Sequence, residues 1–164
     1  MTTITLTLKP LIQLTEHQFY QLCLANPETK LELNSKGELV IMPPTGGTSG
    51  NRNIKLSTRL ENWTETNQNG IAFDSSTMFR LLNGALRSPD AAWISLERWN
   101  SLSTEEQEEF PPICPDFVVE LRSASDSLKS LQEKMQEYIE NGTRLGWLIN
   151  LFPVPSPPHP SPLL

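Results

Sequence analysis

At residues 115–123 the chain reads PDFVVELRS, a short apolar run that follows a proline and ends on a carboxylate. Consecutive apolar residues at Phe117, Val118 and Val119 favour a strand that is covered on both faces, as in the middle of an α/β sheet. Glu120 follows directly, where a carboxylate is costly to bury unless it has a partner or a metal. A carboxylate at the carboxyl end of an inner strand is a common place for a site, although a solvated strand end fits the same pattern.

The composition predicts a soluble globular protein with one domain. Its 164 residues are enough for a hydrophobic core, and 37% of them are hydrophobic while 20% are charged. No apolar run is long enough to span a membrane, and residues 1–10 lack the pattern of a secretion signal. Cys23 and Cys114 have no spacing typical of zinc sites, so we expect buried thiols in a reducing, cytoplasmic compartment. The net charge of −6 disfavours non-specific binding of duplex DNA as the main role.

A locally basic helix is predicted in the first third of the chain. Residues 31–42 predict a hairpin, and the Gly-rich loop after it leads into this helix. The helix carries Arg52, Lys55 and Arg59 in an otherwise acidic protein. A solvated face explains each of these residues singly, but as a group they are candidates for phosphate contacts.

A second carboxylate stands out in the next predicted strands. Residues 78–94 predict a hairpin with an Asn-Gly turn, and its returning strand carries Asp90 between Pro89 and an apolar run. A lone carboxylate is unfavourable there both for strand formation and for burial. Asp90 is therefore a candidate site residue.

A helix with one apolar side is predicted after the inner strand. Its apolar stripe includes Leu131, Met135 and Tyr138. Lys134 lies roughly 90° from the centre of this stripe at 100° per residue. Its stem can follow the core while the amine reaches the end of the sheet.

The folded domain is expected to cover residues 1–150. The last predicted strand ends there, and residues 151–164 form a Pro-rich tail that contains six prolines and no Asp, Glu, Lys or Arg. Proline at this density excludes helix and sheet, so we expect a disordered or polyproline segment.

Two carboxylates on neighbouring strands and a helix-borne amine suit metal-assisted hydrolysis of a phosphodiester. Asp90 and Glu120 would hold a hard divalent cation through oxygen. The cation would lower the pKa of a bound water and neutralise charge on the phosphate. Lys134 would orient that water or stabilise the pentavalent phosphorane. Spacing alone is a weak signal for such a site.

Several stretches in a specific order closely resemble the Uma-two family of restriction-endonuclease-like bacterial proteins. They are GELVIMPPTGG at 37–47, RSPDAAW at 87–93, CPDFVVELRS at 114–123, EKM at 133–135 followed by Tyr138 and Asn141-Gly142, and LGWLI at 145–149. The resemblance implies membership of the PD-(D/E)XK nuclease superfamily, with an α/β (α+β) core in which a mixed β-sheet is flanked by helices. It also implies Mg²⁺ as the cofactor, with Mn²⁺ as a substitute, and DNA as the substrate.

The resemblance assigns roles to individual residues. Pro89-Asp90 takes the PD position and Glu120 takes the (D/E) position. Arg122 stands where a lysine is expected two residues later, and Lys134 on the following helix is the family's counterpart of that lysine. Arg122 is the alternative residue for the positive side chain of the active site. Glu32 matches a family carboxylate in the first strand and is a candidate outer metal contact.

Two functions follow from these features. One is a Mg²⁺-dependent DNA endonuclease, which Asp90, Glu120 and Lys134 favour. The other is a catalytically degenerate family member that acts as a nucleic-acid-binding or dimeric assembly module. The acidic composition favours the second, and so does the C-terminus, where the proline tract replaces a further strand that family members carry. Many restriction-like folds dimerise, so a homodimer is expected and a membrane partner is not. The sequence does not distinguish DNA from RNA.

Overall fold

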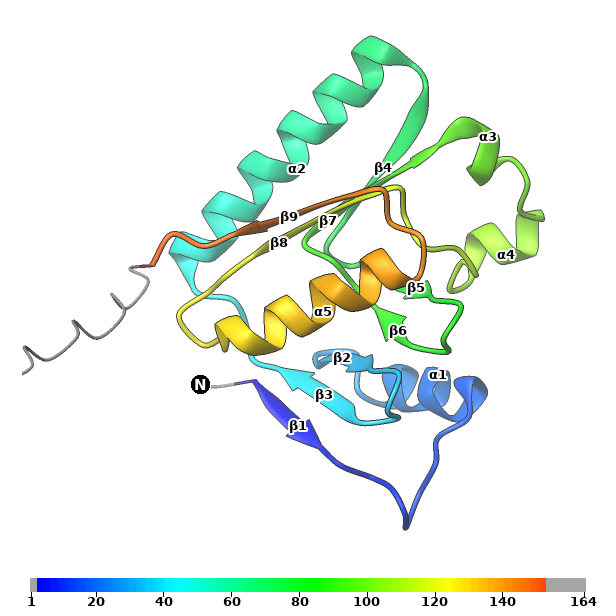
Figure 1. The fold of residues 1–164 in the computed structure, drawn as a ribbon, viewed down its shortest axis with the longest axis vertical. Coiled ribbons are helices and arrows are strands. Elements are labelled where there is room, and N and C mark those ends of the chain that lie inside the picture. Colours follow the sequence, from blue (N-terminus) through cyan, green and yellow to red (C-terminus); the bar gives the residue numbers. More distant parts are fainter. Residues whose placement is uncertain (1–2, 153–164) are drawn as a thin grey trace, which may run out of the picture.

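The computed structural model describes residues 3–152, which form nine strands and five helices (Figure 1). The strands are β1 (Ile4–Leu6), β2 (Lys30–Leu33), β3 (Leu39–Met42), β4 (Gly70–Asp74), β5 (Phe79–Arg80), β6 (Leu86–Arg87), β7 (Ala91–Ser95), β8 (Phe117–Leu121) and β9 (Leu145–Ile149). The helices are α1 (Glu16–Ala25), α2 (Gly47–Asn67), α3 (Leu96–Trp99), α4 (Thr104–Glu108) and α5 (Leu128–Glu140).

The strands form two sheets. One has five strands in the order β1-β3-β2-β6-β5, and the other has four in the order β4-β7-β8-β9. In the four-stranded sheet β8 pairs antiparallel with β7 and parallel with β9, so the expected mixed sheet is confirmed. The two predicted hairpins also form, as β2–β3 and β5–β6.

The chain changes sheets between β6 and β7, and this corrects one expectation. The sequence predicted a single returning strand through Asp90, but β6 ends two residues before Pro89 and β7 begins directly after Asp90. Pro89 has no N–H to give to a ladder. The Ser88 N–H donates to a carboxylate oxygen of Glu32 at 3.0 Å instead of to a strand. Asp90 therefore lies in the short connection between the two sheets.

β8 is an inner strand covered on both faces, as its consecutive apolar residues predict. The side chains of Val118 and Val119 point to opposite faces, and both are fully buried. α5 packs on one face, where Met135 fills the space that a side chain at Gly146 would need. α2 packs on the other face, mainly against β4 and β7. Figure 1 shows β7, β8 and β9 between these two helices, which cover the two faces of the sheet.

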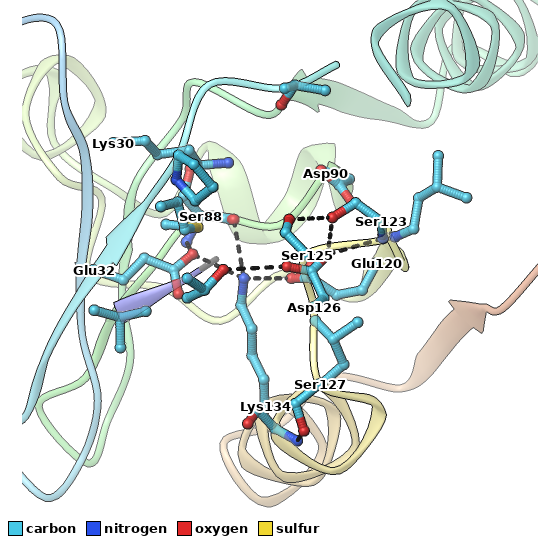
Figure 2. A pocket seen from close by; sticks show the side chains of 18 of the residues that line it. Lys30, Glu32, Ser88, Asp90, Glu120, Ser123, Ser125, Asp126, Ser127 and Lys134 are labelled. Carbon is cyan, nitrogen blue, oxygen red and sulfur yellow. Dashed lines mark hydrogen bonds and ion pairs between the residues drawn. The ribbon is translucent and has the colours of Figure 1, made fainter. Parts of the chain in front are cut away.

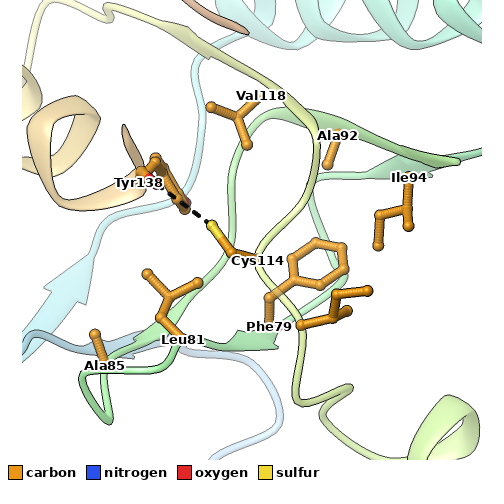
Figure 3. Close-up of a cluster of buried hydrophobic side chains, with 9 residues drawn as sticks. Phe79, Leu81, Ala85, Ala92, Ile94, Cys114, Val118 and Tyr138 are labelled. Atoms are coloured by element: carbon orange, nitrogen blue, oxygen red, sulfur yellow. Dashed lines mark hydrogen bonds between the residues drawn. The ribbon is translucent and has the colours of Figure 1, made fainter. Parts of the chain in front are cut away.

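The main hydrophobic core fixes α5 relative to β8. Its buried side chains include Phe79, Ile94, Val118 and Tyr138 (Figure 3). Tyr138 is fully buried, and its hydroxyl lies 3.4 Å from Oε1 of Glu120. The core therefore extends to the carboxylate at the end of β8.

A polar turn separates β8 from α5. Ser127 is the N-cap of α5. The earlier polar residues form a turn, in which Asp126 Oδ2 accepts from the N–H and the hydroxyl of Ser123 at 2.8 and 2.6 Å. The short side chains of this turn border the same space as Glu120 (Figure 2).

The predicted Pro-rich tail lies outside the described residues from residue 153 onward. Within residues 3–152, no helix combines the length and the apolar character needed to cross a membrane.

Candidate active site

A cleft of about 1400 Å³ opens between the two sheets (Figure 2). Its walls come from β2 and β3 on one side and from the end of β8 on the other, with α2 and α5 adding further residues. In Figure 2, Glu32, Glu120 and Lys134 point toward one another, and Asp90 lies next to Glu120. The cleft therefore brings together four of the charged side chains that the sequence singled out.

Asp90 and Glu120 meet at one end of the four-stranded sheet. The register of β7 and β8, continued by one residue, places them opposite each other. Asp90 Oδ2 accepts from the backbone N–H of Leu121 at 2.7 Å, and Oδ1 accepts from the side-chain amide of Asn53 at 3.2 Å. The backbone of β8 and the helix α2 thus both hold the Asp90 carboxylate.

Lys134 reaches the same place from α5. Its Nζ lies 2.7 Å from Oε1 of Glu120 and 2.8 Å from Oε1 of Glu32. It also donates to the carbonyl oxygen of Ser88 at 3.2 Å. An ammonium has three N–H groups, so these three acceptors use all of them. Only 7% of Lys134 is exposed, which means that water does not compete for the amine.

Glu32 lies on the other side of Lys134, and both of its oxygens have partners. Oε1 accepts from Lys134 and from the backbone N–H of Ser88. Oε2 lies 3.0 Å from Nη1 of Arg87. A divalent cation at Glu32 would meet the positive charges of Lys134 and Arg87, which both contact this carboxylate.

Arg87 and Glu137 extend this network, and sequence reasoning did not single them out as site residues. Arg87 Nε lies 2.5 Å from Glu137 Oε2, and Glu137 Oε1 accepts from the backbone N–H of Ser35 at 3.0 Å. These contacts tie α5 to the β2–β3 turn. Glu137 falls three residues after Lys134 on the same side of α5, and this helical spacing is the signal that could have found it.

The two glutamates that share Lys134 have pKa values shifted in opposite directions. Burial alone would raise the pKa of Glu32, but Lys134 and Arg87 outweigh it and lower the pKa to about 2. Burial raises the pKa of Glu120 to about 7, because Lys134 offsets it only in part. The neighbouring carboxylates of Asp90 and Glu32 add to this rise.

The amine between them stays protonated. Burial opposes a charge on Lys134, but the carboxylates of Glu120 and Glu32 outweigh it and raise the pKa of Lys134 above its ordinary value. Lys134 is therefore a fixed positive charge at neutral pH.

The oxygens that remain available suit a hard cation. Within residues 3–152, no group of three or more His, Cys, Asp or Glu side chains is arranged to hold a metal ion. Among the same residues, Glu120 Oε2 makes no hydrogen bond or ion pair, and Asp90 Oδ1 accepts only from Asn53. Carboxylate oxygens of this kind are ligands that Mg²⁺ prefers, usually together with water.

Comparison with known families now adds to the geometry. Residues 17–155 match the model of the Uma2 family, described as "Putative restriction endonuclease". The chain belongs to the Uma2 family. The resemblance to the Uma-two family drawn from the sequence is thereby confirmed. No protein with a curated description matches this Uma2 chain.

One solved structure has a similar fold. It is the crystal structure of a "putative nuclease belonging to DUF820" from Anabaena variabilis, which this chain matches with a TM-score of 0.67 at 20% identity. The match covers 82% of this chain and 73% of that chain. At this identity the likeness concerns the fold, and it confirms the restriction-endonuclease-like architecture.

In this Uma2 protein, the residue two positions after Glu120 has its partners elsewhere. Arg122 Nη1 donates to Asn150 Oδ1 at 3.2 Å, and Nε donates to the carbonyl oxygen of Asp126 at 3.3 Å. Of the two candidates for the positive side chain of the active site, Lys134 is the one that contacts Glu120.

The predicted phosphate-binding residues of this Uma2 protein lie along α2. Arg52 is half-buried and lines the cleft, whereas Lys55 and Arg59 are exposed. Within residues 3–152, none of the three forms an ion pair. Their spacing of three and four residues puts them on one side of the helix.

Proposed function

We propose that this Uma2 protein is an endonuclease that hydrolyses phosphodiester bonds of DNA, with Mg²⁺ as its cofactor and Mn²⁺ as a substitute. The observation that carries the proposal is the pairing of Asp90 with Glu120 beside the buried ammonium of Lys134. Family membership supports a nuclease function.

The donor set at this end of the sheet fits a divalent cation. Asp90 Oδ1 and Glu120 Oε2 keep lone pairs, and burial raises the pKa of Glu120 because the positive charge of Lys134 offsets it only in part. A bound cation would supply further positive charge, lower the pKa of a bound water and neutralise charge on the phosphate.

Lys134 acts in this proposal as a fixed positive charge rather than as a base. Its amine is held at Glu120, where negative charge on a neighbouring phosphate group would attract one of its N–H groups. Glu32 positions the amine from the opposite side. Because two positive side chains, Lys134 and Arg87, already contact Glu32, we assign it this positioning role in place of the outer metal contact that the resemblance implied.

The charge of the cleft governs how DNA would approach. Eight acidic and five basic side chains line it, so the protein alone repels a polyanion there and bound cations favour its entry. Arg52, Lys55 and Arg59 on α2 offer phosphate contacts next to the cleft.

A catalytically degenerate module for nucleic-acid binding or dimeric assembly is the second candidate function. One observation favours it, because all three N–H groups of Lys134 already have acceptors and must rearrange to serve a substrate. In either role we propose a homodimer in the cytoplasm, where the free thiols of Cys23 and Cys114 would stay reduced.

Cleavage of supercoiled plasmid DNA tests the proposal. Wild-type protein is compared with Asp90→Asn and Glu120→Gln, and with Glu133→Gln as a control carboxylate that lines the same cleft but is largely exposed. We expect nicking that needs Mg²⁺ or Mn²⁺, disappears in both site variants and persists in the control. A folded wild type that nicks nothing would favour the degenerate module. Nicking that survives both substitutions would place the site elsewhere.

A further inference from the structure

Asn53 is an unassigned residue in direct contact with the proposed cation site. It lies in the second turn of α2, lines the cleft, and its Nδ2 donates to Asp90 Oδ1 at 3.2 Å. The other Asp90 oxygen is held by the N–H of Leu121. Asn53 therefore controls the one Asp90 oxygen that the backbone leaves available.

The orientation of the Asn53 amide follows from its neighbour. A carboxylate accepts hydrogen bonds and repels another acceptor, so the NH₂ group faces Asp90 Oδ1, and the carbonyl oxygen stands beside it on the other arm of the same amide. That carbonyl oxygen, Oδ1, is buried, and within residues 3–152 it has no hydrogen-bond partner. A buried acceptor without a partner is uncommon in folded proteins, and an unseen water or ion is one of its explanations.

The composition of the cleft shows what such a partner would be. Mg²⁺ and Mn²⁺ prefer oxygen ligands, which include the amide oxygens of Asn and Gln as well as carboxylates. Asp90 and Glu120 supply two carboxylates, and the described residues offer no group of three or more metal-ligating His, Cys, Asp or Glu. A third protein oxygen beside Asp90 would therefore complete the protein's share of the site.

We infer that Asn53 belongs to the cation site, with its NH₂ group fixing the Asp90 carboxylate and its amide oxygen serving as a third protein oxygen for the cation. This inference rests on the proposed function. The N-terminal part of α2 would then contribute both to phosphate binding, through Arg52, and to the cation site, through Asn53.

A purely structural role for Asn53 makes a different prediction. If Asn53 only fastens α2 to the Asp90 connection, its removal lowers stability and leaves cation affinity unchanged. If its oxygen faces the cation, affinity changes with the oxygen donor at position 53. Binding measured on the protein without DNA separates the two roles.

Isothermal titration of Mn²⁺ into the full chain is the experiment, with thermal unfolding of each variant as the check on folding. The variants are Asn53→Ala and Asn53→Asp, with Asn51→Ala as a matched control because Asn51 is exposed on the same turn of α2. We expect Asn53→Ala to weaken Mn²⁺ binding by about 10- to 100-fold, as for other groups that support a metal ligand. Asn53→Asp should bind Mn²⁺ at least as tightly as wild type and gain more thermal stability from it. Asn51→Ala should match wild type.

Two results would overturn the inference, and only one of them would also overturn the proposed function. Unchanged Mn²⁺ affinity in Asn53→Ala and Asn53→Asp, with affinity lost in Asp90→Asn, would leave the proposed function standing and make Asn53 structural. Absence of Mn²⁺ binding by the wild type would remove the proposed function together with the inference. If Asn53→Ala fails to fold, Asn53→Asp decides alone, and unchanged Mn²⁺ affinity in that variant would overturn the inference.

Discussion

Lys134 stands between two buried glutamates whose surroundings differ. On the side of the five-stranded sheet, Glu32 is enclosed by Lys134, Arg87 and the Ser88 N–H. On the side of the four-stranded sheet, Glu120 shares the same lysine but keeps one oxygen without a partner among residues 3–152. Burial of the two side chains is nearly equal, at 1% and 4% exposed.

The difference shows that burial of a carboxylate does not by itself mark a site. Lys134 and Arg87 hold Glu32 ionised, with a pKa of about 2, whereas the pKa of Glu120 is raised to about 7. The charge of Glu32 is balanced by neighbouring side chains, whereas that of Glu120 is balanced only in part, so Glu120 can interact with a ligand. We therefore expect the side of Glu32 to determine stability and the side of Glu120 to determine activity.

The largest effect should come from neutralising the two glutamates separately. Glu32→Gln removes the counter-charge of a buried Lys134 and Arg87, and we expect it to lower the free energy of unfolding by about 3–5 kcal/mol. Glu120→Gln also removes a counter-charge of Lys134, but Glu32 still pairs with the amine and burial disfavours ionised Glu120, so the free energy of unfolding should fall by much less. Urea unfolding at neutral pH without metal measures both. Equal destabilisation by the two variants would contradict the division of roles.

The next effect concerns the lysine that both sides share. Lys134→Met should reduce the rate of metal-dependent nicking by about 10²–10³-fold, the usual cost of removing one group that stabilises transition-state charge. Arg122→Met is the matched control, because its partners are Asn150 and Asp126 rather than Glu120. Rates of plasmid nicking with Mg²⁺ test the pair. If Arg122→Met lost activity and Lys134→Met kept it, Arg122 would be the positive side chain that acts in the site.

The pH dependence of stability should separate the two glutamates more finely. The raised pKa of Glu120 means that, between an unfolded value near 4.5 and a folded value of about 7, the native state binds a proton that the unfolded state has lost. Its contribution is complete below pH 4.5 and is lost as the pH rises through 7, with a slope of at most about 1.4 kcal/mol per pH unit.

Glu32 has the opposite sign, since its lowered pKa stabilises the protein above 4.5 and this contribution is lost as the pH falls toward 2. Metal-free unfolding of wild type and Glu120→Gln between pH 4.5 and 8 is the measurement, and the difference between the curves isolates Glu120 from other titrating groups. Parallel curves would show that Glu120 is not titrating in this range.

The smallest effect should come from the basic residues of α2, which lie outside the network of Lys134 and the two glutamates. Arg52→Ala, Lys55→Ala and Arg59→Ala should each weaken DNA binding modestly and reduce the slope of log affinity against log salt by about one per lost phosphate contact. The measurement uses the inactive Glu120→Gln background, with Lys129→Ala on α5 as an exposed control. A slope unchanged in all three variants would place the DNA elsewhere.

The sequence predicts the elements well because their signals are local. The apolar run before Glu120 and the stripe of α5 beside Lys134 lie in continuous stretches, so their periods reveal the strand, the helix and the approximate direction of the amine. The same pattern places Asp90 next to a strand. What it misses is the break at Pro89, where the chain leaves one sheet and enters the other.

The ion pairs of Glu32 could not be predicted from the sequence, for a physical reason. Glu32 contacts Lys134 across 102 positions of the chain and Arg87 across 55, and such contacts exist only once β2 has paired with β6 and α5 has packed beside them. Composition also hides Asn53, since an amide among polar residues at a helix start carries no signal of its own. The sequence therefore identified the charged candidates, but only the packed structure shows which of them form ion pairs and which remain available for a site.

The location of a bound cation tests the account most directly. Crystals of the protein grown with Mn²⁺ would show the ion as a peak in an anomalous difference map. The account predicts a peak between Asp90 and Glu120, with Glu32 still paired to Lys134 and Arg87. A peak bound to Glu32, with its ion pairs broken, or no peak at saturating Mn²⁺, would contradict it.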